Sequence, residues 1–191
     1  MKVLLSGFSS FSHHSVNSSE TLALLLEQRK IPHIEIKSVI LPVTFMESFD
    51  CLKEQIDLFQ PDVVISLGLA EKRTVISLEK VALNFIDCQI PDNKGRLIKD
   101  SLILDSAPLA YFSTLPLKEM LEAQSVYPVE ISYSAGTFVC NDLMFRLLNF
   151  FKDKQVLAGF IHVPHIRNDQ DLIIDSLQLM LSKLHQIQNT K

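Results

Sequence analysis

The sequence predicts an α/β protein, a three-layer α/β/α sandwich around a mostly parallel or mixed, twisted central sheet. Short apolar runs rich in branched side chains alternate with segments of helical periodicity along the chain. Several of these runs end at a glycine or a proline, as buried strands commonly do. Because the 191 residues contain no repeat, low-complexity stretch or linker, we expect one domain over residues 1–191.

The N-terminal segment predicts a strand, a loop and a helix. Residues 2–6 form an apolar run that stops at Gly7, which indicates a buried strand. A polar loop follows. Asn17 then precedes a helical pattern over residues 19–29, with Glu20 placed as its capping-box partner.

The same order of elements continues after this helix. Residues 35–41 alternate well enough for a second strand. The sequence Thr-Phe-Met-Glu at 44–47 predicts another capping box, opening a helix that ends near Phe59. Residues 63–67 form a third buried run, which ends at Gly68. Strands that alternate with helices in this way are typical of a sheet flanked by helices.

The second half of the chain is less regular. Residues 75–86 are rich in β-branched side chains and predict one or two strands, whereas residues 91–105 are rich in turn residues. The remaining expected elements are a helix over 116–124, a strand over 130–133, a turn over 134–137, a helix over 139–151, a strand over 156–163 and a helix from its cap Asn168 to residue 188. Apolar stripes mark the last two helices, with Leu143, Leu147, Leu148 and Phe151 on the first and Leu172, Leu177, Leu181 and Leu184 on the second.

Charge and glycine content exclude several classes of partner. The formal net charge is −4, so we expect no basic face and no nucleic-acid partner. The five glycines lie far apart, which excludes a glycine-rich phosphate loop and a dinucleotide-binding fingerprint. The apolar run at the N-terminus is too short for a signal peptide or a membrane-spanning helix. We therefore expect a cytoplasmic protein without a membrane partner.

The cysteines indicate a free thiol rather than a disulfide framework or a metal site. Cys51, Cys88 and Cys140 are odd in number and far apart, and they form no Cys-x-x-Cys pair. This spacing argues against zinc, and we expect no bound metal. A reactive thiol would survive in the reducing cytoplasm.

Cys140 occupies the position most typical of a nucleophile. It follows a predicted strand and a turn and stands at the start of a predicted helix. Unpaired N–H groups and the helix dipole at such a site favour an anion, so we expect a lowered thiol pKa and a place for an oxyanion. The alternative is a buried cysteine that packs beneath the helix as a small apolar side chain.

His162 and Glu79 are the candidate partners of this thiol. His162 ends a predicted buried strand, where α/β sheets carry their chemistry, although a core histidine would fit the same pattern. Glu79 lies in an apolar run, where a carboxylate is unusual unless it has a structural or functional role. It could orient the imidazole. Its alternative role is an ion pair with Lys80 or Arg73 at a strand edge.

Five segments of the chain resemble one family, the pyroglutamyl peptidases, also called pyrrolidone carboxyl peptidases. The segment Ser-Ala-Gly-Thr-Phe-Val-Cys-Asn at 134–141 matches the family's nucleophile motif, and Gly-Phe-Ile-His-Val-Pro at 159–164 matches its histidine motif. Residues 41–45, 61–65 and 90–95 also look like family segments, in family order. The resemblance covers nearly the whole chain.

The resemblance implies both a fold and a chemistry. Members of the family are cytosolic cysteine exopeptidases with an α/β/α sandwich fold and no cofactor. They remove N-terminal pyroglutamyl residues, so the implied partners are peptides with a blocked N-terminus. By resemblance, Cys140 is the nucleophile, His162 the general base and acid, and Glu79 the orienting carboxylate. Dimers or tetramers are frequent in the family, which implies a homo-oligomer here.

The chain departs from the family on the substrate side. After Phe8 the family usually has Glu-Pro-Phe-Gly-Gly, whereas this chain has Ser-Ser-Phe-Ser-His. Leu69 stands where the family commonly has Gln, Gln89 stands where it has Arg, and residues 165–169 also differ. The altered polar positions put pocket specificity in question more than the nucleophile.

We expect the substrate pocket to be bounded by Phe8 or Phe11 and by the segments around Leu69 and Phe138. Flat apolar walls suit a lactam ring, although the first two phenylalanines could equally pack as ordinary loop residues.

Three other functions stay open. One is a cysteine hydrolase with changed N-terminal specificity, which Leu69 and Gln89 favour. Another is a non-catalytic homologue that binds small molecules or peptides, which the intact Cys140, His162 and Glu79 argue against. An unrelated enzyme of the nucleoside phosphorylase type could share the architecture, but the cysteine motif makes it remote.

Overall fold

The computed structural model describes residues 1–11, 17–123, 125–166 and 169–190. Its main sheet has six strands in the order β2-β1-β3-β8-β4-β7. These are β1 (Lys2–Phe8), β2 (Glu35–Leu41), β3 (Val63–Leu69), β4 (Ile76–Glu79), β7 (Val129–Ser132) and β8 (Leu157–Val163). The first four strands in the order are parallel, β4 runs antiparallel to β8, and β7 runs parallel to β4. The predicted mixed sheet is confirmed.

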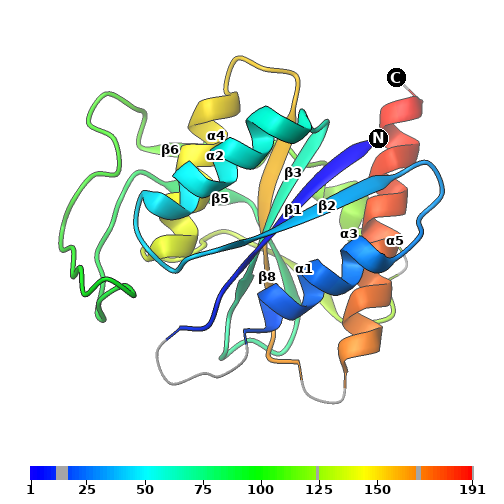
Figure 1. Ribbon diagram of the computed structural model, residues 1–191, viewed down its shortest axis with the longest axis horizontal. Helices are drawn as coiled ribbons and strands as arrows, with labels where there is room; N and C mark the ends of the chain where they lie inside the picture. Colours follow the sequence, from blue (N-terminus) through cyan, green and yellow to red (C-terminus); the bar gives the residue numbers. More distant parts are fainter. Residues whose placement is uncertain (12–16, 124, 167–168, 191) are drawn as a thin grey trace.

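Five helices cover the two faces of this sheet. They are α1 (Ser18–Gln28), α2 (Glu47–Phe59), α3 (Leu117–Leu121), α4 (Val139–Phe151) and α5 (Gln170–Asn189). Figure 1 shows α2 and α4 on one face and α1, α3 and α5 on the other. The three-layer α/β/α sandwich predicted from the alternation of strands and helices is therefore confirmed.

Each face of the sheet has its own apolar core because side chains alternate along a strand. In β1, Leu4 packs under α2 and α4, while Val3 and Leu5 pack under α1 and α5. The predicted apolar face of α4 is buried, with Leu143, Leu147, Leu148 and Phe151 at most 4% exposed. In α5 the predicted stripe holds for three leucines, but Leu172 in the first turn is 45% exposed.

A small second sheet stands beside α4. It pairs β5 (Val81–Leu83) with β6 (Ala110–Phe112), antiparallel. The β-branched stretch over 75–86 thus forms two strands, β4 and β5, while β6 was not predicted. Residues 91–105 contain no helix or strand, as their turn-rich composition indicates.

Local caps were predicted correctly for one helix and wrongly for another. Asn17 caps α1, since its Oδ1 accepts the N–H of Ser19 at 3.1 Å. The capping box proposed at Thr44 is wrong, because α2 begins at Glu47 and Met46, with φ 67°, takes the cap position. Asp142, distant in sequence, accepts the Met46 N–H at 3.1 Å in place of a local cap. The predicted cap Asn168 lies outside the described residues.

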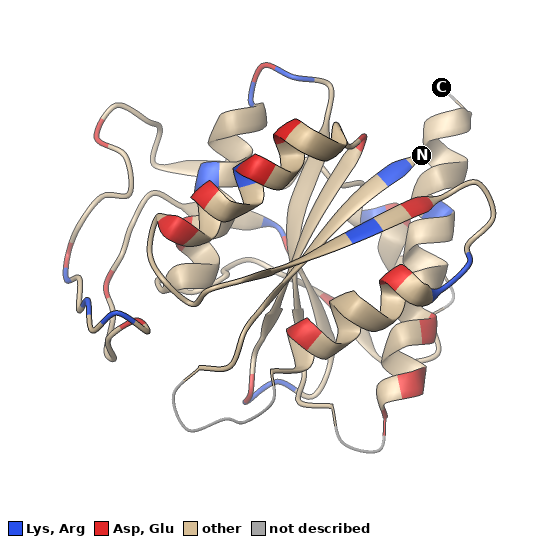
Figure 2. Ribbon diagram, in the orientation of Figure 1, with Lys and Arg blue, Asp and Glu red and all other residues tan. Residues whose placement is uncertain are grey.

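The charged side chains are spread over the surface. Figure 2 shows acidic residues along α1, α2 and α5, while Lys and Arg are scattered among loops, strands and helices. None of the helices in the described part of the chain is both long and apolar enough to cross a bilayer.

Candidate active site

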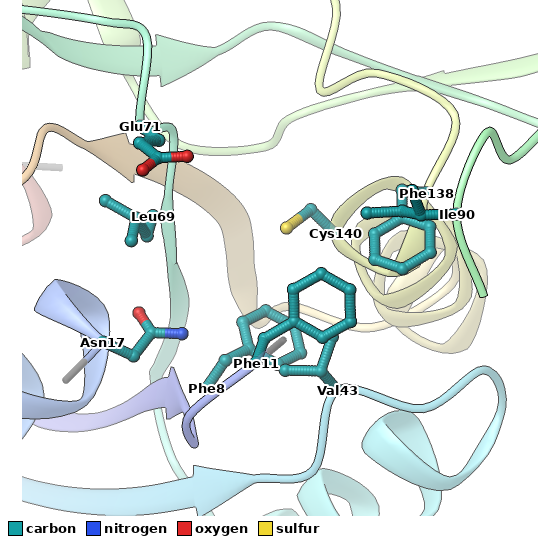
Figure 3. Close-up of a pocket in the computed structure, with 9 residues that line it drawn as sticks. All are labelled: Phe8, Phe11, Asn17, Val43, Leu69, Glu71, Ile90, Phe138 and Cys140. Carbon is teal, nitrogen blue, oxygen red and sulfur yellow. The ribbon is translucent and has the colours of Figure 1, made fainter. Parts of the chain in front are cut away.

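A pocket lies where the parallel strands end. The carboxyl ends of β1 and β3 meet the segments that follow β2 and precede α4, as expected for ligand sites in open α/β sheets. The pocket has a volume of about 400 Å³. Its lining, drawn in Figure 3, consists of Phe8, Phe11, Asn17, Val43, Leu69, Glu71, Ile90, Phe138 and Cys140.

Cys140 reaches this pocket from the first turn of α4. Gly136, with φ 83°, allows the sharp turn that leads from β7 into the helix. Phe138 at the cap position has no polar group with which to occupy the first N–H groups of α4. Figure 3 shows the sulfur turned into the pocket toward Leu69. The thiol therefore stands beside helix N–H groups and open space at once.

The residues after Cys140 hold the start of α4 in place. Asn141 is fully buried, and its side chain bonds the N–H of Leu83 and the carbonyls of Leu83 and Phe85 at 2.8–3.0 Å. Asp142 accepts from Met46 and from Arg146 Nε at 2.8 Å. The bonds to Leu83, Phe85 and Met46 tie the start of α4 to the end of β5 and to the segment before α2.

His162 and Glu79 are in direct contact on the same face of the sheet. The antiparallel register pairs His162 with Ser77 and Phe160 with Glu79, so the imidazole and the carboxylate lie diagonally across two strands. His162 Nδ1 is 2.7 Å from Glu79 Oε1, which directs Nε2 away from the carboxylate. Both side chains are buried, with 7% and 0% of their surface exposed.

Gly68 brings the thiol next to this pair. It stands opposite His162 in the register of β3 and β8. A Cβ atom added to Gly68 would lie 3.1 Å from Cys140 Sγ, so the sulfur covers the space that a side chain would occupy. The predicted nucleophile and base therefore occupy neighbouring positions at one edge of the sheet.

Glu79 makes both of the contacts that the sequence left open. Besides His162, it binds Arg73 Nη1 at 2.6 Å through the same Oε1 atom. Burial raises the pKa of Glu79, but the bond to His162 and the charge of Arg73 outweigh this effect and leave the pKa below its ordinary value. The carboxylate is therefore ionised and can stabilise a positive imidazole.

The expected lowering of the Cys140 pKa is wrong for this structure. Removal of the sulfur from water raises the pKa to about 12, and the negative charge of Glu79 acts in the same direction. Arg73 opposes this rise only weakly. Desolvation has a larger effect on the Cys140 pKa than the helix N-terminus has. The dipole of the helix acts only within its first turn and corresponds to only about 0.3–1 kcal/mol at surface sites.

The four predicted pocket residues all line the cavity. The rings of Phe11 and Phe138 lie 5.4 Å apart, and Phe45 packs edge-on against Phe138 at the same distance. Phe8 is almost fully buried at the end of β1. Leu69 adds an apolar side chain at the end of β3. These side chains form flat, apolar walls beside the thiol.

Four further pocket residues were not predicted: Asn17, Val43, Glu71 and Ile90. Asn17 was identified only as a helix cap, but its Nδ2 also donates to the carbonyl of Ser9 at 3.0 Å. Glu71 is the charged side chain among the lining residues, and its carboxylate faces the cavity in Figure 3. Its position two residues after Leu69 was the sequence feature from which its place in the pocket could have been predicted.

The segment after Ile90 fastens the rim of the pocket. Asp92 is buried and accepts the N–H of Phe45 at 3.1 Å and those of Lys94 and Arg96 at 2.9 Å. Its neighbour Asn93 donates through the backbone to Val43 and through Nδ2 to the carbonyl of Ser10, at 3.0 and 3.1 Å. This loop thereby holds two of the pocket's edges.

Within the described residues, no group of three or more His, Cys, Asp or Glu side chains is arranged to hold a metal ion.

Comparisons with known proteins agree with one another. A family model described as pyroglutamyl peptidase matches residues 1–183. A pyrrolidone-carboxylate peptidase of Pyrococcus furiosus is 39% identical over 181 residues, which cover 93% of this chain and 86% of the relative. One from Halalkalibacterium halodurans is 42% identical over 167 residues, covering 85% and 83%. The crystal structure of Bacillus amyloliquefaciens pyroglutamyl peptidase I superposes with a TM-score of 0.91 at 32% identity, covering 96% of each chain.

Proposed function

Because the chain belongs to the pyroglutamyl peptidase family, we propose that it removes N-terminal pyroglutamyl residues from peptides, with Cys140 as the nucleophile. The observation that carries the assignment of residues is the contact of His162 with Glu79 beside the Cys140 thiol, at the edge of an apolar pocket. The substrates are peptides whose N-terminus is blocked by the lactam ring.

The reaction runs in two halves. In the first, Cys140 Sγ attacks the pyroglutamyl carbonyl carbon while its proton passes to His162, and Glu79 stabilises the imidazolium. The oxyanion forms beside the N–H groups at the start of α4. As the C–N bond breaks, His162 returns the proton to the leaving amine and a thioester remains.

In the second half, water attacks the thioester carbonyl and gives its proton to His162. Collapse of this intermediate breaks the C–S bond, returns the proton to the sulfur and releases free pyroglutamate. Since burial raises the pKa of Cys140 to about 12, proton transfer accompanies the attack rather than preceding it. Glu79, whose pKa is lowered, stays ionised throughout this cycle.

The pocket walls match the ring better than they match its polar atoms. A lactam carries one N–H and one carbonyl, and leaving either unpaired in a dry pocket costs about 1–3 kcal/mol. Leu69 cannot form a side-chain hydrogen bond. Asn17 and Glu71 are the polar side chains that line the cavity beside the thiol, and both are in reach of a ligand from the same side. These two residues are the candidate partners of the lactam.

The activity is tested by hydrolysis of a chromogenic pyroglutamyl substrate. We expect release of the chromophore by the wild type and none by Cys140→Ala. Burst kinetics with an activated ester substrate would reveal the thioester. A wild-type protein that binds pyroglutamyl peptides without turning them over would support the non-catalytic alternative instead.

A cysteine hydrolase with changed N-terminal specificity is the second candidate, favoured by the presence of Leu69 in the pocket. A panel of aminoacyl chromogenic substrates separates it from the first. Cleavage of another N-terminal residue at a higher kcat/KM than pyroglutamate would establish the changed specificity.

We also propose that residues 1–191 act as one domain within a cytoplasmic homo-oligomer, a dimer or a tetramer. Dependence on a free thiol supports a reducing compartment. Leu109 and Phe112, which are 80% and 65% exposed at β6 of the small second sheet, support burial against another copy. Sedimentation of the wild type and of Phe112→Ser tests this assembly, and a monomeric wild type would refute it.

A further inference from the structure

Arg73 lies in the loop between β3 and β4 and reaches two parts of the active site. Its Nη1 donates to Glu79 Oε1 at 2.6 Å, and its Nη2 donates to the carbonyl of Ser134 at 3.2 Å. Ser134 opens the turn that leads to Cys140. One guanidinium thus joins the carboxylate behind the imidazole to the turn before the nucleophile.

The backbone of this loop is held independently of the side chain. The N–H of Arg73 closes a turn on the carbonyl of Ala70 at 2.9 Å. The N–H of Ala70 donates to the carbonyl of Val163 at 2.9 Å, one residue beyond His162. The backbone at Arg73 is therefore held against β8. The side chain loses little conformational freedom when its guanidinium group binds Glu79.

Glu79 depends on few partners. Oε1 accepts from both His162 Nδ1 and Arg73 Nη1, whereas Oε2 is buried without a hydrogen-bond partner among the described residues. The nearby hydroxyl of Ser132 donates to the carbonyl of Ser134 at 3.3 Å and also helps to lower the pKa of Glu79. Without Arg73, the buried carboxylate would keep its short bond to His162 and the weaker interaction with Ser132, and its rotation would be less well defined.

We propose that Arg73 is a positioning residue, which locks Glu79 against His162 and joins this pair to the turn that carries Cys140. The proposal deepens the proposed function and rests on it. The fixed cation also keeps Glu79 ionised while leaving its charge available to the imidazolium. Arg73 itself is not one of the residues that line the pocket.

The charged groups around the pair leave this role to Arg73. On the neighbouring elements, Cys140 of α4 faces the pair, and Glu130 of β7 accepts a bond from Ser77 at 2.8 Å. Lys80, next in sequence, extends over the ring of Phe112. Within the described part of the chain, Arg73 is the one Lys or Arg side chain within ion-pair distance of Glu79.

The test compares Arg73→Gln and Arg73→Lys with Lys72→Gln, a change of the exposed neighbour in the same loop. We expect Arg73→Gln to lower kcat about 10- to 100-fold, as loss of a supporting hydrogen bond commonly does, with KM within about threefold of wild type. The acid limb of kcat/KM should move to higher pH, because Glu79 loses a positive charge that lowers its pKa. Arg73→Lys should recover part of the loss.

A second readout does not depend on turnover. Arg73→Gln should slow iodoacetamide labelling of Cys140 at pH 8 about 3- to 10-fold. The positive charge of Arg73 favours the thiolate, and the substitution removes this charge. Lys72→Gln should label like the wild type. A lowered unfolding temperature with an unmoved acid limb and unchanged labelling would show a merely structural role and overturn the proposal. If the wild type cleaves no pyroglutamyl substrate but the labelling difference persists, the proposed function fails while the role of Arg73 stands.

Discussion

Two opposing effects act on the Cys140 thiol, and their relative size decides how the site works. The helix N-terminus favours the thiolate, while desolvation and Glu79 disfavour it. Because the pKa rises to about 12, a thiolate would form at neutral pH only as a proton moves to His162.

This balance predicts how the cysteines react. Cys140 should be alkylated by iodoacetamide faster than Cys51 and Cys88 near neutral pH, since it lines an open pocket beside a base while Cys88 is 2% exposed. Because burial raises the pKa of all three thiols, the expected difference rests on the neighbouring base and on access to the pocket. The Cys140 rate should climb steadily from about pH 6 to 9 without a plateau. Mass-spectrometric rates check this, and a plateau near neutrality would reveal a preformed thiolate.

Leu69 predicts weakened recognition of the lactam. Leu69→Gln would supply an amide at the pocket wall and should raise kcat/KM for a pyroglutamyl substrate about 5- to 200-fold, the equivalent of one hydrogen bond of 1–3 kcal/mol. Leu69→Met, similar in volume but without a hydrogen-bonding amide, is the matched control. Equal kcat/KM for all three proteins, with robust wild-type activity, would show that Leu69 does not contact the substrate.

At the scale of elements, the end of β3 is shaped by the close approach of the thiol. A Cβ atom at Gly68 would lie 2.6 Å from the Phe160 ring and 3.1 Å from Cys140 Sγ. Phe160 in turn packs on the imidazole of His162, with ring centroids 4.9 Å apart. The strand therefore needs glycine here because the Phe160 ring and the Cys140 sulfur fill the space above it.

Gly68→Ala should displace the thiol, the Phe160 ring or both. We expect kcat to fall about 100-fold, because shifts of about 1 Å at a reacting atom have effects of this size. Gly159→Ala is the control, since its Cβ would meet Leu115 and Ser113 at 2.5 Å rather than the thiol. Both variants should lose about 1–3 kcal/mol of stability through overpacking. A similar loss of kcat in both would mean that destabilisation alone explains the effect.

At the scale of the whole molecule, buried carboxylates link stability to pH. Burial raises the pKa of Asp92, but the N–H groups of Arg96, Phe45 and Lys94 outweigh it and lower the pKa. A carboxylate with a lowered folded-state pKa stabilises the protein above its ordinary pKa of 3.8, and this stabilisation is lost as the pH falls through the folded-state value. Asp92 joins the loop after Ile90 to the segment before α2, so its loss affects the whole pocket rim.

Asp92→Asn should therefore cost about 1–3 kcal/mol at pH 7, through weakened bonds to buried N–H groups. Its free energy of unfolding should also decrease less than that of the wild type between about pH 5 and 3. Asp57→Asn removes an exposed ion pair with Lys53 and should change stability by less than about 1 kcal/mol. Denaturant unfolding at each pH measures both. Parallel curves for wild type and Asp92→Asn would contradict the linkage.

Much of the architecture was predictable because it is encoded locally. The spacing of Leu143, Leu147, Leu148 and Phe151 predicted the buried face of α4, and the bounds of β2 and α4 were correct to the residue. The motif at 134–141 and the place of Cys140 at a helix start predicted this residue as the nucleophile. In these cases the burial of a side chain depends on its neighbours within a turn of helix or along a strand. The periodicity of the sequence therefore predicts it.

Tertiary structure alone decided the features that depend on residues far apart in the chain. Met46 takes the cap position of α2, where its N–H donates to Asp142, a residue distant in sequence. The pocket residues that were not predicted come together only where separate loops close the pocket; they are Asn17, Val43, Glu71 and Ile90. The direction of the Cys140 pKa shift also follows from burial and from Glu79, and neither is visible in the local motif. The sequence determined the fold class and predicted the reacting groups, whereas packing determined their solvation, which governs the pKa of the thiol.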